Sequence, residues 1–346
     1  MRFHRPRGLR SHPKVSVVIP CYQYGHFLPT AVESVLAQTD VEVEVVIVDD
    51  ASSDNSAQVA HALAAKDSRV RVVAHGVNLG HIATYNDGLS RVCGDYVVLL
   101  SADDALVTGS LARAVALMQA HPRVGLVYGY SVPFSDEVRE VAPRVRSWST
   151  WNGRDWLARM CRRAENPIST PEVVMRREAW DEIGGYDPRV PHAADMLVWF
   201  RTAARWDIGR VNSEAQAQYR VHGDNMHLTT YSGMLRDLRE QRQVFSVLFR
   251  DSAAYLKGSQ QLELAARRAL ARRALRLATA ERLSPDGAAL TEEYRRFAAQ
   301  TLPDELRTWS WRLRRAGDSL LESRVATPVR RVVEHVVWRR WRRYGT

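Results

Sequence analysis

Short runs of apolar, β-branched residues alternate with amphipathic segments through the first half of the chain, and this alternation constrains its fold more than any other feature. The runs have the length of buried strands, and apolar residues recur between them with the period of a helix. The runs occupy residues 15–20, 43–50, 69–75, 96–100 and 125–131. Strands that alternate with helices predict an α/β fold around a mostly parallel central sheet. Later segments predict a strand over 168–175 and helices over 149–160 and 194–206.

Carboxylate side chains stand where two of these predicted strands end. Asp50 closes the second apolar run, and Asp103 and Asp104 follow the fourth. Parallel α/β sheets bind their ligands at this edge. A divalent cation held by Asp103 and Asp104 would bind phosphate oxygens and stabilise a departing diphosphate, while Asp50 would accept a hydrogen bond from a base or a ribose. The alternative is that these carboxylates only form turns and cap helices.

The overall composition is ordinary for a globular protein, but its charge is basic. A formal charge of +10 favours an anionic partner such as a nucleotide, a nucleic acid or an acidic membrane surface. The three cysteines are far apart, which indicates a reducing compartment and no disulfide framework. No apolar region follows the basic N-terminus, and no apolar stretch reaches about 18 residues, so we expect neither a signal peptide nor a transmembrane helix. The first turn lacks a GxGxxG motif, which argues against a dinucleotide cradle.

Six segments, taken in order, resemble the signature segments of family 2 glycosyltransferases, which have the GT-A fold. They span about residues 14–226 and read VSVVIPCYQYGHFLPTAVESVLAQT, VEVVIVDDASSDNS, NLG, GDYVVLLSADD, GGYD and YRVH. The resemblance implies an inverting enzyme that uses a nucleotide-diphosphate sugar, most commonly a UDP-sugar, together with Mg²⁺ or Mn²⁺. The acceptor would be a hydroxyl of a glycan, of a lipid-linked molecule or of another compound.

The resemblance implies a nucleotide-binding role for residues at three strand ends. Pro20 and Tyr22 would line the base pocket, and Asp50 would contact the base or the ribose. Asn78 and Gly80 would shape the loop on the nucleotide side. Each of these residues matches a position in the family's motifs, so the resemblance implies that together they form a nucleotide-binding site.

The resemblance also implies a metal site next to the diphosphate. Asp103 and Asp104 correspond to the DXD-type element, with Asp104 as the main metal ligand and Asp103 shared between ribose and metal. Arg220 and His222 alternate on an extended segment and therefore point the same way. Together they would hold the diphosphate or complete the metal shell. For His222 alone, a structural or surface role is the alternative.

Asp195 occupies the position at which the family carries its catalytic base. An inverting transfer needs one base, which takes the proton from the acceptor hydroxyl as the anomeric carbon is attacked. The alternative role for Asp195 is that of N-cap of the helix that follows. The chain departs from the family pattern at Gln23, Ser101 and Ala194, where the family often has Asn, Asp and Glu. The change at Ser101 leaves fewer acids for a metal.

The chain is expected to have three parts, which are a basic tail over 1–13, a GT-A domain over 14–228 and a helical accessory region over 229–346. The segment 330–346, RRVVEHVVWRRWRRYGT, would form a helix whose apolar stripe is rimmed by arginine. Such a helix suits peripheral contact with an anionic membrane, and the alternative is packing on the catalytic domain or on a second subunit. No nucleic-acid-reading motif is present, so we expect no nucleic-acid partner.

These features predict a metal-dependent inverting glycosyltransferase, located in the cytoplasm or bound peripherally to the inner face of the cell membrane. Two alternatives stay open. One is a nucleotide-sugar-binding protein without turnover, which the missing acids at Ser101 and Ala194 favour. The other is a nucleotidyltransferase, although no basic, Gly-rich triphosphate loop lies near the first strand.

Overall fold

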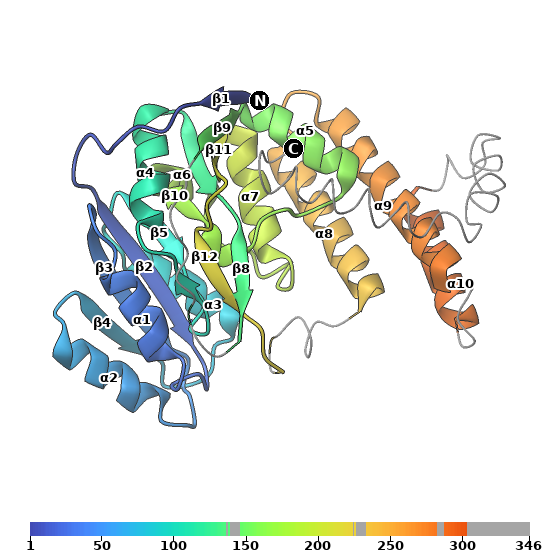
Figure 1. The fold of residues 1–346 in the computed structure, drawn as a ribbon. Coiled ribbons are helices and arrows are strands. Elements are labelled where there is room, and N and C mark those ends of the chain that lie inside the picture. The colour runs from blue at the N-terminus through green and yellow to red at the C-terminus, as the bar shows by residue number, and fades with distance from the viewer. Residues whose placement is uncertain (136–137, 139–145, 224, 226–232, 282–286, 303–346) are drawn as a thin grey trace. The chain divides into compact units, whose positions relative to one another are not determined.

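Figure 1 shows the computed structural model of the chain, which describes residues 1–135, 138, 146–223, 225, 233–281 and 287–302. The chain forms two compact units. The first comprises Met1–Leu157 and Pro167–Thr229, and the second comprises Ala158–Asn166 and Thr230–Thr346. The division into three parts that the sequence suggests stays a prediction.

The first unit is an α/β fold built on a nine-stranded sheet with the order β1-β9-β11-β7-β10-β5-β2-β3-β4 (Figure 1). A smaller sheet has the order β6-β12-β8. The strands of the large sheet are β1 (Arg2–His4), β2 (Lys14–Cys21), β3 (Glu42–Asp49), β4 (Val70–Ala74), β5 (Tyr96–Leu99), β7 (Val124–Tyr128), β9 (Ser147–Trp151), β10 (Val174–Arg176) and β11 (Asp207–Asn212). Those of the small sheet are β6 (Ala105–Leu106), β8 (Ser131–Phe134) and β12 (Ala217–Arg220).

The half of the large sheet formed by β5, β2, β3 and β4 is entirely parallel, as the sequence predicts. Its register pairs Cys21 of β2 with Asp49 of β3, so these strands end side by side. In the other half, β10 runs antiparallel between β5 and β7, and β9 runs antiparallel to both β1 and β11. The sheet is therefore mixed, with its parallel strand ends gathered at one edge.

Helices cover both faces of the large sheet. Helices α1, α2 and α4 share a core with one face, while α3, α6 and α7 pack on the other face. In α1 the buried residues Leu28, Ala31, Val32 and Val35 follow the spacing of an amphipathic helix. The helices of this unit, with α5 crossing into the second, are α1 (Leu28–Leu36), α2 (Ser56–Lys66), α3 (His81–Ser90), α4 (Ser110–Ala120), α5 (Gly153–Arg163), α6 (Arg177–Ile183) and α7 (Ala194–Arg205).

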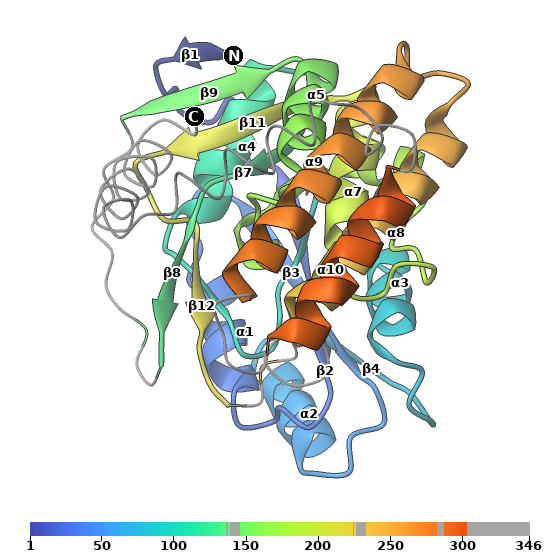
Figure 2. The same ribbon diagram turned by 90° about the vertical axis from the view of Figure 1, so that its right-hand side faces the viewer.

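The second unit is helical over its described residues. Helices α8 (Met234–Ser252), α9 (Ser259–Glu281) and α10 (Ala288–Thr301) pack against one another, and Figure 2 shows them side by side. Their buried residues are mainly Ala, Leu, Val and Phe, in keeping with the helical period of this part of the sequence. The predicted membrane-binding segment 330–346 lies outside the described residues. Within the described part of the chain, no helix combines the length and the apolar character that crossing a membrane requires.

Two predicted elements differ from the structure. Residues 168–175 were expected to form one strand, but they hold a 3-10 turn at Thr170–Glu172 before the short strand β10. Pro171 favours this turn because its ring fixes φ and removes a ladder donor. The helix expected over 149–160 begins only at Gly153, because the residues before it pair with β1 and β11 as β9. Pairing with distant strands overrides the local helical pattern there.

Candidate active site

The polar residues predicted at the strand ends do lie along one edge of the sheet. The backbone N–H of Asp50 donates to the carbonyl of Cys21 at 2.9 Å, which joins the ends of β3 and β2. The loop after β5 carries Asp103 and Asp104 from the neighbouring strand. Tyr22, in the loop after β2, is 47% exposed, so its ring is free to meet a ligand. The edge thus carries an exposed ring after β2 and carboxylates after the neighbouring strands β3 and β5.

Asp50 organises the loop that precedes α3. Its carboxylate accepts hydrogen bonds from the backbone N–H groups of Leu79 at 2.8 Å and Gly80 at 2.9 Å, and from His75 at 2.8 Å. Asn78 donates from its side chain to the carbonyl of Asp50 at 3.3 Å. Burial raises the pKa of Asp50, but these hydrogen bonds outweigh burial and hold that pKa below its usual range. The predicted nucleotide residues Asp50 and Asn78 are therefore brought together.

Asp103 and His222 meet at the same edge, although 119 positions separate them in the chain. The Nε2 atom of His222 lies 3.0 Å from Oδ2 of Asp103. Asn225 holds this pair in place, because its Oδ1 accepts the backbone N–H of His222 at 2.8 Å and its amide reaches Asp103 at 3.5 Å. Asn225 was not predicted, although it stands only three residues after the histidine. The pair presents one oxygen and one nitrogen donor.

Asp104 has a different environment from its neighbour. Its side chain is buried, and one oxygen accepts the backbone N–H of Arg220 at 2.9 Å. Burial, and then the nearby charge of Asp103, raise the pKa of Asp104 well above its usual range. Asp104 therefore ties the loop after β5 to β12, and its side chain is turned into the protein.

Arg220 is also built into the protein frame. Its guanidinium donates to the carbonyls of Asp103 at 2.9 Å and Ser135 at 2.6 Å. It lies between the rings of Phe27 and Phe134, at 4.6 and 4.3 Å from their centroids. The ring of Phe27 also packs against His222. Arg220 and His222 thus border the same aromatic ring, in keeping with their alternate positions on the extended segment.

Asp195 lies in the first turn of α7 and is partly exposed. The N-cap of this helix is Ala193, so Asp195 does not occupy the capping position. Its Oδ1 accepts the backbone N–H of Met196 at 2.7 Å. The buried phenol of Tyr186 is a neighbour, since burial and then the charge of Asp195 raise the pKa of Tyr186. A partly exposed carboxylate therefore lies beside the GGYD turn.

The other carboxylate of this turn is Asp187, which is held by arginines on two sides. Arg189 and Arg201 donate to its oxygens at 2.6 and 2.8 Å. The hydrogen bonds from Arg189 are the main reason that the pKa of Asp187 lies far below its usual range. Because both oxygens are engaged, Asp187 fixes the turn, whereas Asp195 is the more exposed of the two carboxylates.

The donor set suits a hard divalent cation that shares its ligands with a substrate. Within the described residues, no group of three or more His, Cys, Asp or Glu side chains is placed to hold a metal ion. Asp103 and His222 supply two donors, and phosphate oxygens are the usual further ligands of Mg²⁺ or Mn²⁺ in such sites. The residues present therefore fit a cation that binds together with a diphosphate.

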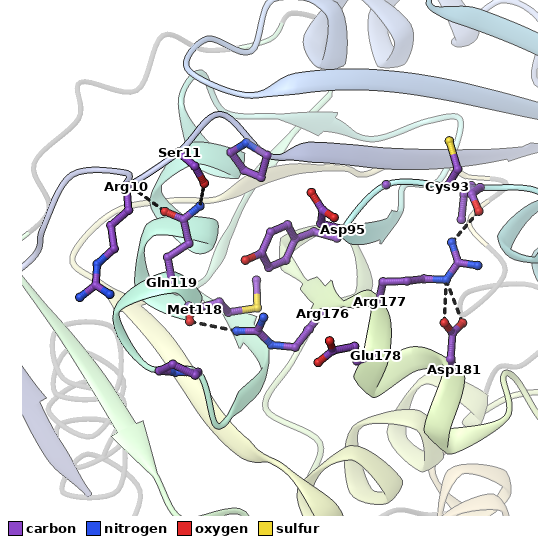
Figure 3. A pocket seen from close by; sticks show the side chains of 15 residues that line it. Arg10, Ser11, Cys93, Asp95, Met118, Gln119, Arg176, Arg177, Glu178 and Asp181 are labelled. Carbon is purple, nitrogen blue, oxygen red and sulfur yellow. Dashed lines mark hydrogen bonds and ion pairs between the residues drawn. The ribbon is translucent and has the colours of Figure 1, made fainter.

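A separate cavity of about 800 Å³ lies beside the amino-terminal ends of β2 and β5 (Figure 3). Its charged groups are largely paired or balanced: Arg177 binds Asp181 at 2.8 Å, and Arg176 donates to the Met118 carbonyl at 3.0 Å. None of the predicted site residues lines this cavity. The predicted site residues lie at the opposite edge of the sheet.

Comparison with known proteins identifies the family. Residues 16–184 match the family described as Glycosyl transferase family 2. An uncharacterized glycosyltransferase of Nostoc sp. is 29% identical over 63% of this chain and 68% of its own length. A Bacillus subtilis protein described as glycosyltransferase EpsE is 32% identical over 56% of this chain and 68% of its own length.

Two solved structures share the fold. Staphylococcus aureus TarS 1–349 in complex with UDP-GlcNAc has a TM-score of 0.59 and 17% identity, covering 75% of this chain and 72% of its own. The mannosyltransferase PcManGT from Pyrobaculum calidifontis in complex with GDP-Man and Mn²⁺ has a TM-score of 0.51 and 19% identity, covering 86% of this chain and 88% of its own. The sequence resemblance and the fold agree, and the chain belongs to glycosyl transferase family 2 and is a glycosyltransferase.

Proposed function

We propose that this glycosyltransferase moves a sugar from a nucleotide-diphosphate donor to an acceptor hydroxyl, with inversion, and that a divalent cation assists it. The observation that carries the proposal is the pair formed by Asp103 and His222, 3.0 Å apart at the carboxyl ends of the parallel strands. The loop held by Asp50 lies at the same edge. A metal-binding pair beside a nucleotide loop is the arrangement that a nucleotide-sugar requires.

Asp103 is the metal-facing carboxylate in this proposal. The sequence resemblance implies Asp104 as the main metal ligand, but Asp104 is the more deeply buried of the two, and one of its oxygens accepts the backbone N–H of Arg220. Asp103 instead stands next to the imidazole of His222. When bound, the cation supplies a positive charge that stabilises the departing diphosphate. Asp103 and His222 are the residues that would hold the cation.

The remaining residues bind the donor, orient the groups around it, or accept the proton of the acceptor hydroxyl. Pro20 and Tyr22 border the base, and Asp50 with Asn78 shapes the loop against which the base and ribose lie. Arg220 keeps the segment with His222 in register through its contacts with Asp103 and Ser135. Asp195 takes the proton from the acceptor hydroxyl, because its carboxylate is partly exposed.

The structural neighbours support a nucleotide-sugar donor, since one was solved with UDP-GlcNAc and another with GDP-Man and Mn²⁺. We favour a UDP-sugar as the donor. The acceptor is a hydroxyl of a glycan or of a lipid-linked molecule.

A transfer assay with a panel of nucleotide-sugars tests the proposal. The panel contains UDP-GlcNAc, GDP-mannose and dTDP-glucose, each offered with Mn²⁺ and with simple glycans or lipid-linked sugars as acceptors. We expect one donor to release its nucleoside diphosphate together with a glycosylated product of inverted configuration.

Asp195→Asn should lower the turnover of that donor by roughly 10²- to 10⁴-fold, because the general base is lost. The same variant should bind the donor as tightly as the native chain. Asp181→Asn, which removes an exposed carboxylate of α6, is the matched control and should keep full activity. Full activity of Asp195→Asn would exclude Asp195 as the base, and release of pyrophosphate from a nucleoside triphosphate would exclude sugar transfer.

A further inference from the structure

His75 follows β4 and joins two carboxylates that belong to different elements. Its Nδ1 lies 2.8 Å from Oδ1 of Asp50, and its Nε2 lies 3.1 Å from Oδ2 of Asp87 on α3. Asp87 in turn pairs with Arg91 at 2.9 Å. The imidazole is 9% exposed, so water cannot easily replace these partners. When the imidazole is protonated, the charges alternate along the series Asp50, His75, Asp87 and Arg91.

Both ring nitrogens of a histidine donate hydrogen bonds only when the ring is protonated. A neutral ring carries one N–H and leaves either Asp50 or Asp87 facing a lone pair. Burial lowers the pKa of His75, but the hydrogen bonds and charges of the two carboxylates outweigh burial and place the pKa above the ordinary value of 6.5. Two charged groups contact the ring of His75. They are Asp50, which directly follows β3, and Asp87 of α3, and the nearby Arg91 pairs with Asp87.

The carboxylate of Asp50 connects this ring to the loop over residues 77–80. One oxygen accepts both His75 and the N–H of Leu79, and the other oxygen accepts the N–H of Gly80. The side chains of Val77 and Leu79 are 66% and 52% exposed. The loop therefore buries little apolar surface of its own and depends on these polar contacts for its position.

We propose that His75 is a positioning residue for the donor, because in its protonated form it ties Asp50 to Asp87 and so fixes the nucleotide-side loop. The inference rests on the proposed function, since the loop is taken to receive the nucleotide. Donor affinity is then highest below the pKa of His75 and falls as the pH rises through it. The KM for the donor rises over that window, while kcat at saturating donor does not depend on His75.

Calorimetric titration of the full chain with a nucleotide-sugar, in Mg²⁺, measures this affinity directly. Nucleotide-sugars are suitable probes because their diphosphates are esterified at both ends and keep a constant charge near neutrality. The panel is UDP-GlcNAc, GDP-mannose and dTDP-glucose, titrated from about pH 5.5 to about pH 8.5, across the range in which histidine ionises. Both the native chain and His75→Asn contain His222, so comparing their Kd values at each pH removes the effect of His222 and of the metal. For the donor that binds, we expect the native Kd to lie roughly three- to tenfold below that of His75→Asn at low pH, the change that one net hydrogen bond would cause, and to approach it at high pH.

Two variants separate a positioning role from a merely structural one. His75→Asn keeps an amide donor near the Nδ1 position but is too short to reach Asp87, so we expect weaker binding at low pH, without the pH dependence that His75 contributes. Asp87→Asn keeps the ring and the shape but removes one favourable charge, so the midpoint of the profile should move to lower pH. Asp181→Asn is the control for loss of a carboxylate elsewhere and should leave the midpoint unchanged.

The outcomes distinguish this inference from the function on which it rests. If the ratio of the native Kd to that of His75→Asn is the same at every pH, or if Asp87→Asn has the native midpoint, His75 does not position the loop, although the proposed function stands. If no member of the panel binds at any pH, both fail. Thermal unfolding shows whether each variant is folded, and should His75→Asn unfold, the midpoint shift in Asp87→Asn decides the question by itself.

Discussion

Among the buried carboxylates of this chain, the donors around each side chain decide whether it is charged. Asp50 accepts three strong hydrogen bonds and its pKa is lowered despite burial. Glu172 is equally buried, but it accepts a side-chain hydrogen bond from Ser131 at 3.0 Å, and its Oε1 has no hydrogen-bond partner within the described part of the chain. Burial raises the pKa of Glu172 to about 7.

Glu172→Gln is expected to stabilise the protein at alkaline pH. The unfolded chain loses this proton near pH 4.3, whereas the folded chain keeps it to about pH 7, so stability falls as the pH rises across this window. Glutamine has the shape of the protonated acid and stays neutral. At about pH 8 the free energy of unfolding should rise by about 1–3 kcal/mol, and the gain should disappear near pH 4.

Thermal unfolding at several pH values measures the effect of Glu172→Gln. Arg210 is the charged neighbour that acts against the raised pKa. A lower melting temperature of the variant at about pH 8 would mean that Glu172 is ionised against Arg210, and would contradict the prediction.

Motifs in the sequence predict single candidate site residues more readily than the contacts between them. The sequence places Asp103 and His222 shortly after a strand and Asp195 at the start of a helix, so each residue stands out. Which carboxylate of the acidic pair is the more deeply buried could not be predicted, because it depends on the pairing of β12 with distant strands. His75 and Asp87 also escaped prediction, since a lone histidine carries no pattern and its two partners lie on separate elements.

At the scale of elements, the parallel half of the sheet was predictable because its strands are buried on both faces. Strands of that kind appear as continuous apolar runs, as in β2 and β3. Short strands such as β6 and β12 carry no such run, and β12 buries polar residues, including Gln218 and Arg220. Their pairing is set by tertiary contacts, so the small sheet that orders the loop with Asp103 and Asp104 was missed.

The close contact of α3 with the sheet depends on Gly88. A Cβ atom at this position would clash with Cγ1 of Val18 and lie 2.8 Å from Cγ2 of Val48, so the helix would have to move. We expect Gly88→Ala to lower the free energy of unfolding by about 1–3 kcal/mol, despite the better helix propensity of alanine. Urea denaturation measures the change.

Gly76→Ala is the control for Gly88→Ala, because a Cβ atom at Gly76 would meet no heavy atom within 4 Å. It should leave the midpoint of urea unfolding nearly unchanged. If Gly88→Ala were as stable as the native chain, the packing of α3 on β2 and β3 would be looser than described.

At the scale of the whole molecule, all of the predicted site residues belong to the first compact unit. The family match ends at residue 184, whereas Asp195, Arg220 and His222 lie beyond it. Their proposed roles therefore depend on geometry: Asp195 stands beside the GGYD turn, and the segment with Arg220 and His222 returns through β12 to Asp103. The net charge of +10 suits the anionic donor that this edge would bind.

The most direct test is the metal dependence of donor binding. Calorimetry would compare the native chain in Mn²⁺ and in EDTA with Asp103→Asn and Asp104→Asn in Mn²⁺, using the nucleotide-sugar that supports transfer. We predict that EDTA and Asp103→Asn each weaken binding by roughly tenfold or more, whereas Asp104→Asn stays within about threefold of the native Kd, because a neutral side chain suits its buried site. Equal affinity of the native chain with and without metal, or a larger loss in Asp104→Asn than in Asp103→Asn, would contradict the proposed site.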